Sequence, residues 1–239
     1  MGLASGRHRF DFGLYRLGHR LALFAAGLSP LTETALWLSL FALLATAAAV
    51  RWAPLMAADR ALLRWVNQGW AARWLDKLMA FFSDMGKMPL LWLLSLGWLL
   101  IFAVRKSGWR KGWTNWLKTV LMLAIAIGCA DGLCSHVAKG LVHRERPPYL
   151  VKGVRLPKGV GSSLGFPSSH AANAFAAARV LSASAPPRWL WWLLATAIAL
   201  SRVYLGVHFP ADSVGGALLG LTVGALVVWM RQRLTTQSD

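Results

Sequence analysis

The sequence predicts an all-α membrane protein, a bundle of six transmembrane helices flanked by amphipathic helices that lie at the membrane surface. Two observations carry this prediction. Of the 239 residues, 56% are hydrophobic and only 15% are charged, which is more apolar than an ordinary soluble domain. In addition, long apolar stretches recur along the chain, and the segments between them are polar or amphipathic. We expect one domain over residues 1–239.

Residues 1–33 are predicted to stay at the cytoplasmic side of the membrane interface. Arginines recur between Arg7 and Arg20, and the apolar run that follows is short for a secretory signal. Residues 10–28 are therefore expected to form an amphipathic helix whose arginines face lipid headgroups.

Six apolar stretches are predicted to cross the membrane. A crossing helix needs about 20 residues, with a range of about 17–25. The fourth and fifth stretches are shorter, so we expect flanking polar residues that face protein or a cavity to extend them. The predicted spans are Ala35–Trp52, Met88–Val104, Trp116–Ala138, Ala171–Ser184, Leu190–Tyr204 and Ser213–Met230.

Residues 56–86 carry too many charges to span the membrane, but their apolar residues recur near helical spacing. They are predicted to form one or two helices on the outer interface, with a break at Asn67-Gln68-Gly69. Two interpretations remain open for these helices. They shape an entrance for lipid, or they pack over the bundle.

Three polar blocks lie beside predicted span ends, within residues 139–212. They supply three cations, two imidazoles and one carboxylate. Such a set can bind a phosphate, attack its phosphorus atom through an imidazole nitrogen and protonate the leaving group. One such block is a weak signal, whereas three in this order are specific. The blocks read Lys139-x6-Arg146-Pro147, Pro167-Ser168-Ser169-His170 and Ser201-Arg202-x5-His208-x3-Asp212.

The third block contains the predicted nucleophile. Pro210 suits the first turn of a helix, and His208 and Asp212 are four residues apart. We expect the carboxylate to accept a hydrogen bond from one imidazole nitrogen, which leaves the lone pair of the other nitrogen free to attack phosphorus. Arg202 is expected to clamp phosphate oxygens.

The first two blocks are predicted to hold the phosphate and to protonate the leaving group. Ser168 or Ser169 is expected near the N-cap of a helix, where unpaired N–H groups favour an anion. His170 is placed to act as general acid. Lys139 and Arg146 supply positive charge.

These blocks resemble the three signature motifs of the type 2 phosphatidic acid phosphatase (PAP2) superfamily, which read K-x6-R-P, P-S-G-H and S-R-x5-H-x3-D. Ser169 stands where the family usually has glycine, and a positive φ would be strained for serine. The resemblance implies no metal or cofactor. It also implies a phosphohistidine on His208, leaving-group assistance by His170, orientation of His208 by Asp212, and phosphate binding by Lys139, Arg146, Arg202, Ser168 and the backbone of Ser169.

The net charge of +17 favours anionic partners. Anionic lipid is expected rather than nucleic acid, because the basic residues fall between apolar spans. The leading function is a phosphatase for a lipid phosphate or diphosphate, such as undecaprenyl diphosphate, phosphatidic acid, phosphatidylglycerol phosphate or lipid A. A lipid phosphotransferase is the second interpretation. A transporter that uses Asp131, His136 and Arg202 as an ion path is the third.

We expect the chain to lie in a bacterial inner membrane, with both termini cytoplasmic and the motif face outside. Lys and Arg are about equally frequent on the two sides, but the outer set includes cations that the motifs assign to substrate. Arg144 and Glu145 are interpreted as a solvated loop pair, and Lys152, Arg155 and Lys158 as a basic loop over the site. The oligomeric state is not predicted.

Overall fold

The structure is a computed structural model that describes residues 29–159 and 164–236. These residues form helices and loops, with one isolated β-bridge between Glu145 and Leu164. The all-α prediction is therefore confirmed for the described part of the chain. The amphipathic helix predicted over residues 10–28 lies outside the described residues.

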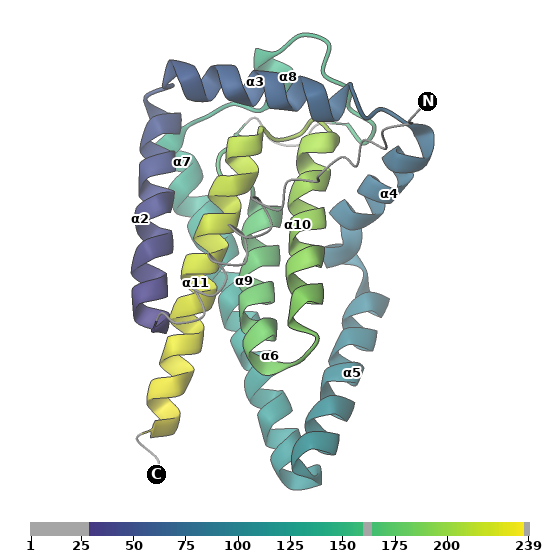
Figure 1. Ribbon diagram of the computed structural model, residues 1–239, viewed down its shortest axis with the longest axis vertical. Helices are drawn as coiled ribbons and strands as arrows, with labels where there is room; N and C mark the ends of the chain where they lie inside the picture. Colours follow the sequence, from purple (N-terminus) through teal and green to yellow (C-terminus); the bar gives the residue numbers. More distant parts are fainter. Residues whose placement is uncertain (1–28, 160–163, 237–239) are drawn as a thin grey trace, which may run out of the picture.

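The predicted spans correspond to helices that run side by side in a bundle (Figure 1). α6 continues through a π-helical segment, Leu133–Ala138, into the short α7, Lys139–Val142. The bundle helices are α2 (Pro30–Ala49), α5 (Pro89–Ser107), α6 (Trp109–Gly132), α9 (Ser169–Ser184), α10 (Arg188–Tyr204) and α11 (Pro210–Thr236).

Four helical stretches are long and apolar enough to cross a membrane by length and composition, so the predicted count of six spans is not confirmed. α9 has 16 residues and α10 has 17, fewer than the roughly 20 that a crossing helix needs. The four stretches are Pro30–Ala49, Leu90–Ser107, Trp109–Val142 and Pro210–Leu234.

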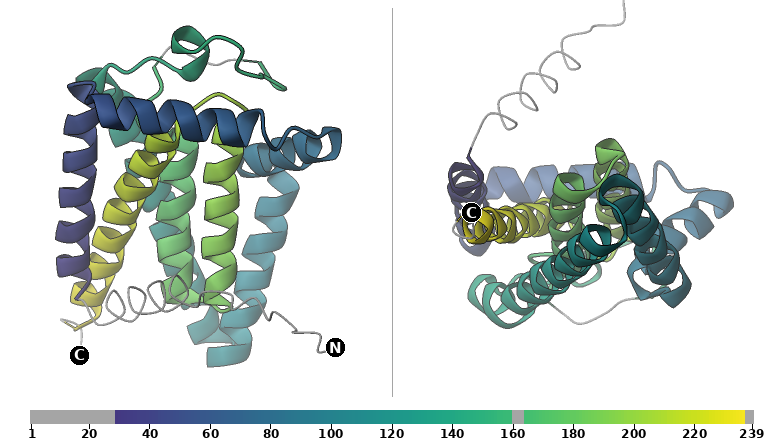
Figure 2. Two further views of the ribbon diagram at one scale, coloured as in Figure 1. Left: turned by 45° about the horizontal axis from the view of Figure 1, so that its top comes forward. Right: turned by 90° about the horizontal axis from the view of Figure 1, so that it is seen from below.

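The surface segment forms α3 (Ala53–Asn67), α4 (Arg73–Asp84) and a 3-10 turn at Met85–Lys87. The chain breaks after Asn67, as the sequence predicts. α3 lies across one end of the bundle (Figures 1 and 2), and it buries Asp59, Leu63 and Val66. The loops that carry the three motif blocks lie at this same end, together with the one-turn helix α8 (Pro147–Leu150).

Glycines of α11 let its backbone approach that of α9 closely. A Cβ at Gly216 would lie 2.3 Å from the carbonyl oxygen of Ser168, and a Cβ at Gly220 would lie 2.2 Å from that of Ala172. Small residues at such spacing allow membrane helices to pack backbone to backbone. This packing fixes the first turn of α11 against the first turn of α9, and both turns belong to the motif site.

Replacing Gly220 by alanine is expected to destabilise the bundle by about 1–3 kcal/mol, because the added methyl group meets backbone and forces the two helices apart. The measurement is the thermal midpoint of the protein in detergent. Gly128→Ala is the matched control, since a Cβ there has no neighbour within 4 Å. Equal midpoints for the two variants would show that the α9–α11 contact tolerates separation.

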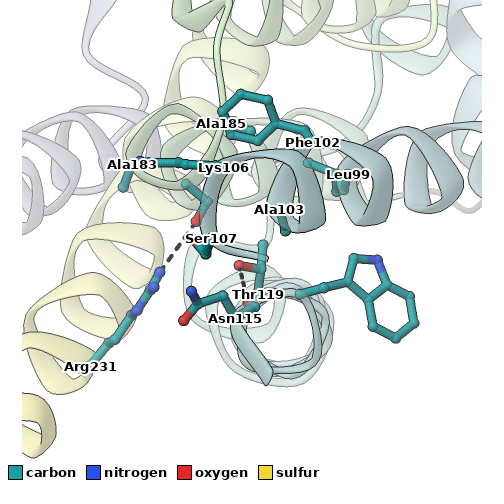
Figure 3. Close-up of a pocket in the computed structure, with 12 residues that line it drawn as sticks. Leu99, Phe102, Ala103, Lys106, Ser107, Asn115, Thr119, Ala183, Ala185 and Arg231 are labelled. Carbon is teal, nitrogen blue, oxygen red and sulfur yellow. Dashed lines mark hydrogen bonds between the residues drawn. The ribbon is translucent and has the colours of Figure 1, made fainter. Parts of the chain in front are cut away.

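The described chain begins and ends at the end of the bundle opposite α3 (Figure 1). That opposite end also holds a pocket of about 170 Å³ between α5, α6, α9 and α11. Arg231 reaches toward it and donates a hydrogen bond of 3.4 Å to Ser184 Oγ (Figure 3). None of the motif residues lines this pocket.

Candidate active site

The loop between α10 and α11 positions His208. This loop covers residues 205–209, and the His208 side chain is buried with 1% exposure. Its Nε2 atom lies 3.4 Å from Nη1 of Arg146. A guanidinium group can only donate, so Nε2 is the acceptor and Nδ1 carries the proton. This tautomer presents the lone pair of Nε2 to Arg146, a predicted phosphate-binding cation.

Asp212 holds the loop of His208 rather than the imidazole itself. Its Oδ2 atom lies 3.6 Å from His208 Nδ1, which is too long for the hydrogen bond that the sequence predicts. Oδ2 instead accepts from the backbone N–H of Phe209 at 2.8 Å. The predicted hydrogen bond between Asp212 and the His208 ring is therefore wrong. The carboxylate instead fixes the backbone next to His208 and faces the ring as a nearby negative charge.

The second block forms the start of α9. Ser168 is the N-cap residue, but its side chain makes no capping hydrogen bond, and its buried Oγ has no partner among the described residues. The backbone N–H groups of Ser169, His170 and Ala171 likewise have no partner in the described part of the chain. A helix start with unpaired donors favours an anion.

Ser169 adopts the helical conformation, so the strain expected from a serine at this position is absent. It is the first residue of α9 and is not among the described residues with positive φ. Its Oγ atom lies 3.3 Å from Cys134 Sγ and 3.4 Å from Ser135 Oγ, on the π-helical segment. The Ser169 hydroxyl therefore turns away from the motif site, and only its backbone N–H remains as a possible phosphate donor.

The predicted cations gather around the two histidines. Arg146 is 7% exposed, and its Nη1 donates to the carbonyl of Val207 at 3.1 Å. Arg202 donates to Ser83 Oγ on α4. The Nε atoms of both arginines are buried without a partner among the described residues. Lys139 lies at the start of α7, within electrostatic range of His208.

His170 and His208 lie at one site, because each is within electrostatic range of the other and of Arg146 and Arg202. Burial lowers the pKa of the His208 imidazole well below its ordinary value of 6.5, and Arg146 and Arg202 lower it further. His208 is therefore neutral at physiological pH, as a nitrogen nucleophile must be. The structure brings together the cations, imidazoles and carboxylate that the three blocks supply.

Comparison with protein families identifies the chain. The model of the PAP2 superfamily matches residues 115–236, a range that contains all three blocks. The chain belongs to the PAP2 superfamily. It is accordingly a lipid phosphate phosphatase, as are relatives that act on lipid A, undecaprenyl diphosphate and phosphatidylglycerophosphate.

One of the most similar PAP2 relatives is the lipid A 4'-phosphatase of Bacteroides thetaiotaomicron, which is 32% identical over 196 residues, 76% of this chain and 81% of that protein. Two solved structures share the fold. A phosphatidylglycerolphosphate phosphatase from Bacillus subtilis superimposes with a TM-score of 0.62 at 25% identity, over 86% of this chain and 96% of that one. Aquifex aeolicus LpxE gives a TM-score of 0.53 at 29% identity, over 70% and 92%.

Arg144 is the main feature of this PAP2 site that the sequence interpretation missed. It is 4% exposed, so it is not half of a solvated loop pair, although its neighbour Glu145 is exposed. Its guanidinium donates to Asp212 Oδ1 at 2.9 Å and to Asp59 Oδ2 at 2.6 Å. Asp59 also accepts from the backbone N–H of Ala211 at 2.8 Å. Arg144 thus ties α3 to the first turn of α11.

Lys87 is a second residue near the site that the sequence interpretation missed. It lies in the 3-10 turn after α4, and it is within electrostatic range of His170. In the segment predicted to be a basic loop over the site, which contains Lys152, Arg155 and Lys158, two of the three cations have acidic partners. Nη2 of Arg155 donates to both carboxylate oxygens of Asp76 at 2.9 Å, and Lys158 pairs with Asp84. These two cations fasten the loop to α4 and the turn after it.

The depressed pKa of His208 makes a prediction about pH. The nucleophile must be neutral, so activity is lost only when the pH falls through its pKa in the free enzyme. Because that pKa lies well below 6.5, kcat/KM, corrected for ionisation of the substrate phosphate, should show no His208 limb between pH 6 and 7. An acid limb near the ordinary histidine value of about 6.5 would mean that the imidazole is solvated during catalysis.

Proposed function

We propose that the protein removes phosphate from a lipid phosphate or diphosphate at the outer face of a bacterial inner membrane, through a phosphohistidine on His208. One observation carries this proposal. Donors that have no partner among the described residues, including the buried Ser168 Oγ, lie at the start of α9, at the same site as the Nε2 lone pair of His208. Unpaired buried donors cost free energy unless a ligand satisfies them. A phosphate group accepts hydrogen bonds through several oxygens and balances the local positive charge.

The first step transfers the phosphoryl group to the enzyme. Nε2 of His208 attacks phosphorus, the bond from phosphorus to the lipid oxygen breaks, and His170 donates a proton to that oxygen. Arg146, Arg202 and Lys139, with the N–H groups of α9, hold the three remaining phosphoryl oxygens. Asp212, 3.6 Å from Nδ1, offsets the positive charge that develops on the imidazole.

The second step regenerates the enzyme. His170, now neutral, takes a proton from water, and the resulting hydroxide attacks phosphorus. The bond from phosphorus to Nε2 breaks, and the electron pair returns to His208. Inorganic phosphate leaves, and His170 again carries the proton that it donates in the next turnover. Bound phosphate supplies the negative charge that a protonated His170 needs among these cations.

The arrangement of the ends supports the proposed orientation. The start of α2 and the end of α11 lie at the end of the bundle opposite the motif site. If both termini are cytoplasmic, the motif site therefore opens at the outer face. Cysteine labelling in intact cells measures this orientation. One variant carries a cysteine in the C-terminal segment, and in the other the exposed Lys152 is replaced by cysteine. Labelling of the Lys152→Cys variant alone by an impermeant reagent is the expected result.

Phosphate release from a panel of lipid phosphates tests the activity. The protein purified in detergent should release phosphate from at least one lipid, and His208→Ala should abolish the release. Phosphate that appears only on a second lipid or sugar would replace the proposal with a phosphotransferase. Absence of turnover with every lipid phosphate and diphosphate would overturn the proposal.

A further inference from the structure

A groove of about 360 Å³ opens beside the candidate active site, between α5, α6, α9 and α10. Ser169 and His170 form part of its wall, so the groove is continuous with the site. Its lining is mainly apolar, which suits hydrocarbon. An alcohol that leaves toward His170 therefore extends from the phosphorus atom into this groove. The apolar lining includes Leu91, Leu96, Leu123, Ile127, Leu181 and Leu194.

Two of the polar side chains in this lining lie about one helical turn from the phosphate cradle. Asn173 follows Ser169 by four residues and His170 by three, so the three side chains share one face of α9. Asp131 faces Asn173 from α6, and Nδ2 of Asn173 donates to Asp131 Oδ1 at 3.1 Å. Both residues line the groove and both are half-buried. One turn corresponds to about 5.4 Å along the helix.

Two acceptor atoms of this pair have no hydrogen bond from the described residues. Oδ1 of Asn173 is buried without a partner, and only Oδ1 of Asp131 takes part in the bond with Asn173. A polar group left unpaired in apolar surroundings lowers stability. A ligand in the groove that donates a hydrogen bond to the carboxylate removes part of this cost.

The charge of the pair restricts what it binds. A carboxylate repels a second phosphate group and gains nothing from a bare hydrocarbon chain, whereas it accepts well from a neutral hydroxyl or amide N–H group. The position of the pair, one turn from His170, places that donor within a few bonds of the leaving oxygen.

We propose that the Asp131–Asn173 pair selects lipid monophosphates whose alcohol carries a neutral hydrogen-bond donor close to the phosphate. Phosphorylated sugar lipids and glycerol phosphates with a free hydroxyl belong to this class. A polyprenyl chain has only carbon at the same distance and leaves the carboxylate unpaired. This inference rests on the proposed function and adds the chemistry of the leaving alcohol.

A matched pair of substrates tests this selection. One is a 1-acylglycerol 3-phosphate, which has a free 2-hydroxyl, and the other is its 2-deoxy analogue. The wild-type kcat/KM should favour the hydroxyl-bearing lipid by about tenfold or more, since a site that hydrogen-bonds a substrate hydroxyl rejects the analogue without it. In Asp131→Leu this ratio should fall to near one. Thr119→Val, a polar-to-apolar change on the same helix outside the groove, should keep the wild-type ratio.

The outcomes separate this inference from the proposed function. A wild-type ratio near one, or an unchanged ratio in Asp131→Leu, would overturn the selection while leaving the phosphatase intact. Absence of release from both lipids, and from every other lipid phosphate, would instead count against the proposed function. If Asp131→Leu does not fold, Asp131→Asn serves in its place. It keeps the size of the side chain and replaces the charge with a weaker acceptor, so the ratio should drop part of the way, and a wild-type ratio would contradict the inference.

Discussion

Replacing His208 by alanine is expected to lower kcat by about a thousandfold or more, because the variant has no nitrogen to attack phosphorus. Its Nε2 atom lies 3.4 Å from Nη1 of Arg146, a predicted phosphate-binding cation, so it is placed to attack a bound phosphate. The measurement is single-turnover phosphate release from a lipid phosphate, together with binding of that lipid at equilibrium. Binding should change far less than turnover.

His170→Ala is the informative companion to this variant. Without the His170 imidazole, kcat for an alkyl phosphate should fall by about a hundredfold to ten-thousandfold, because the leaving oxygen of an alkyl phosphate needs a proton. With an aryl phosphate, whose leaving group needs little help, phosphorylation should be nearly normal and the phosphoenzyme should accumulate. The assigned roles are wrong if His208→Ala retains a substantial fraction of wild-type kcat. They are also wrong if His170→Ala lowers the rate of phosphorylation equally for the alkyl and the aryl phosphate.

Replacing Arg144 by leucine is expected to cost about 3–5 kcal/mol of stability, the usual consequence of leaving buried charges without their partner. Asp59 and Asp212 would then face each other inside the protein with no cation between them. Burial raises the pKa of the Asp59 carboxyl, and Arg144 opposes this effect. The loss should therefore appear as a lower thermal midpoint in detergent and as a lower kcat, since α11 and His208 lose their fixed position.

Controls separate the buried bridge from a general effect of charge. Arg60→Leu removes an exposed arginine from the same region of the surface and should change stability by no more than about 0.5 kcal/mol. Arg144→Lys keeps the charge but not the two-pronged geometry, so it should recover only part of the stability. Similar midpoints for Arg144→Leu and Arg60→Leu would contradict the structural role of Arg144.

The helix positions and the convergence of the three blocks follow from local patterns. Apolar length predicts α2, α5, α6 and α11, and the polar tripeptide at Asn67-Gln68-Gly69 predicts the break between α3 and α4. The spacing of the blocks predicts that His208, His170 and the cations meet at one end of the bundle. These features depend on residues that are near one another in the chain or beside a span end.

The details that the sequence interpretation missed depend on contacts between distant segments. Arg144 is buried because Asp59, 85 residues away, reaches it from α3. One signal was present, since Asp59 lies on the same face of α3 as Leu63 and Val66, and a carboxylate on a buried face requires a partner. The His208–Asp212 spacing predicted a hydrogen bond to the ring. The helix begins at Pro210, as the sequence predicts, but the carboxylate accepts a hydrogen bond from the backbone N–H of Phe209 and not from the ring.

The stereochemical course at phosphorus tests the central claim, transfer through His208, most directly. The substrate is a lipid thiophosphate made chiral with oxygen isotopes, turned over in isotopically labelled water, and the configuration of the released thiophosphate is measured. Each in-line displacement inverts phosphorus, so attack by His208 followed by attack by water gives net retention. Retention is the predicted result. Net inversion would mean a single direct attack by water, and it would contradict the phosphohistidine mechanism.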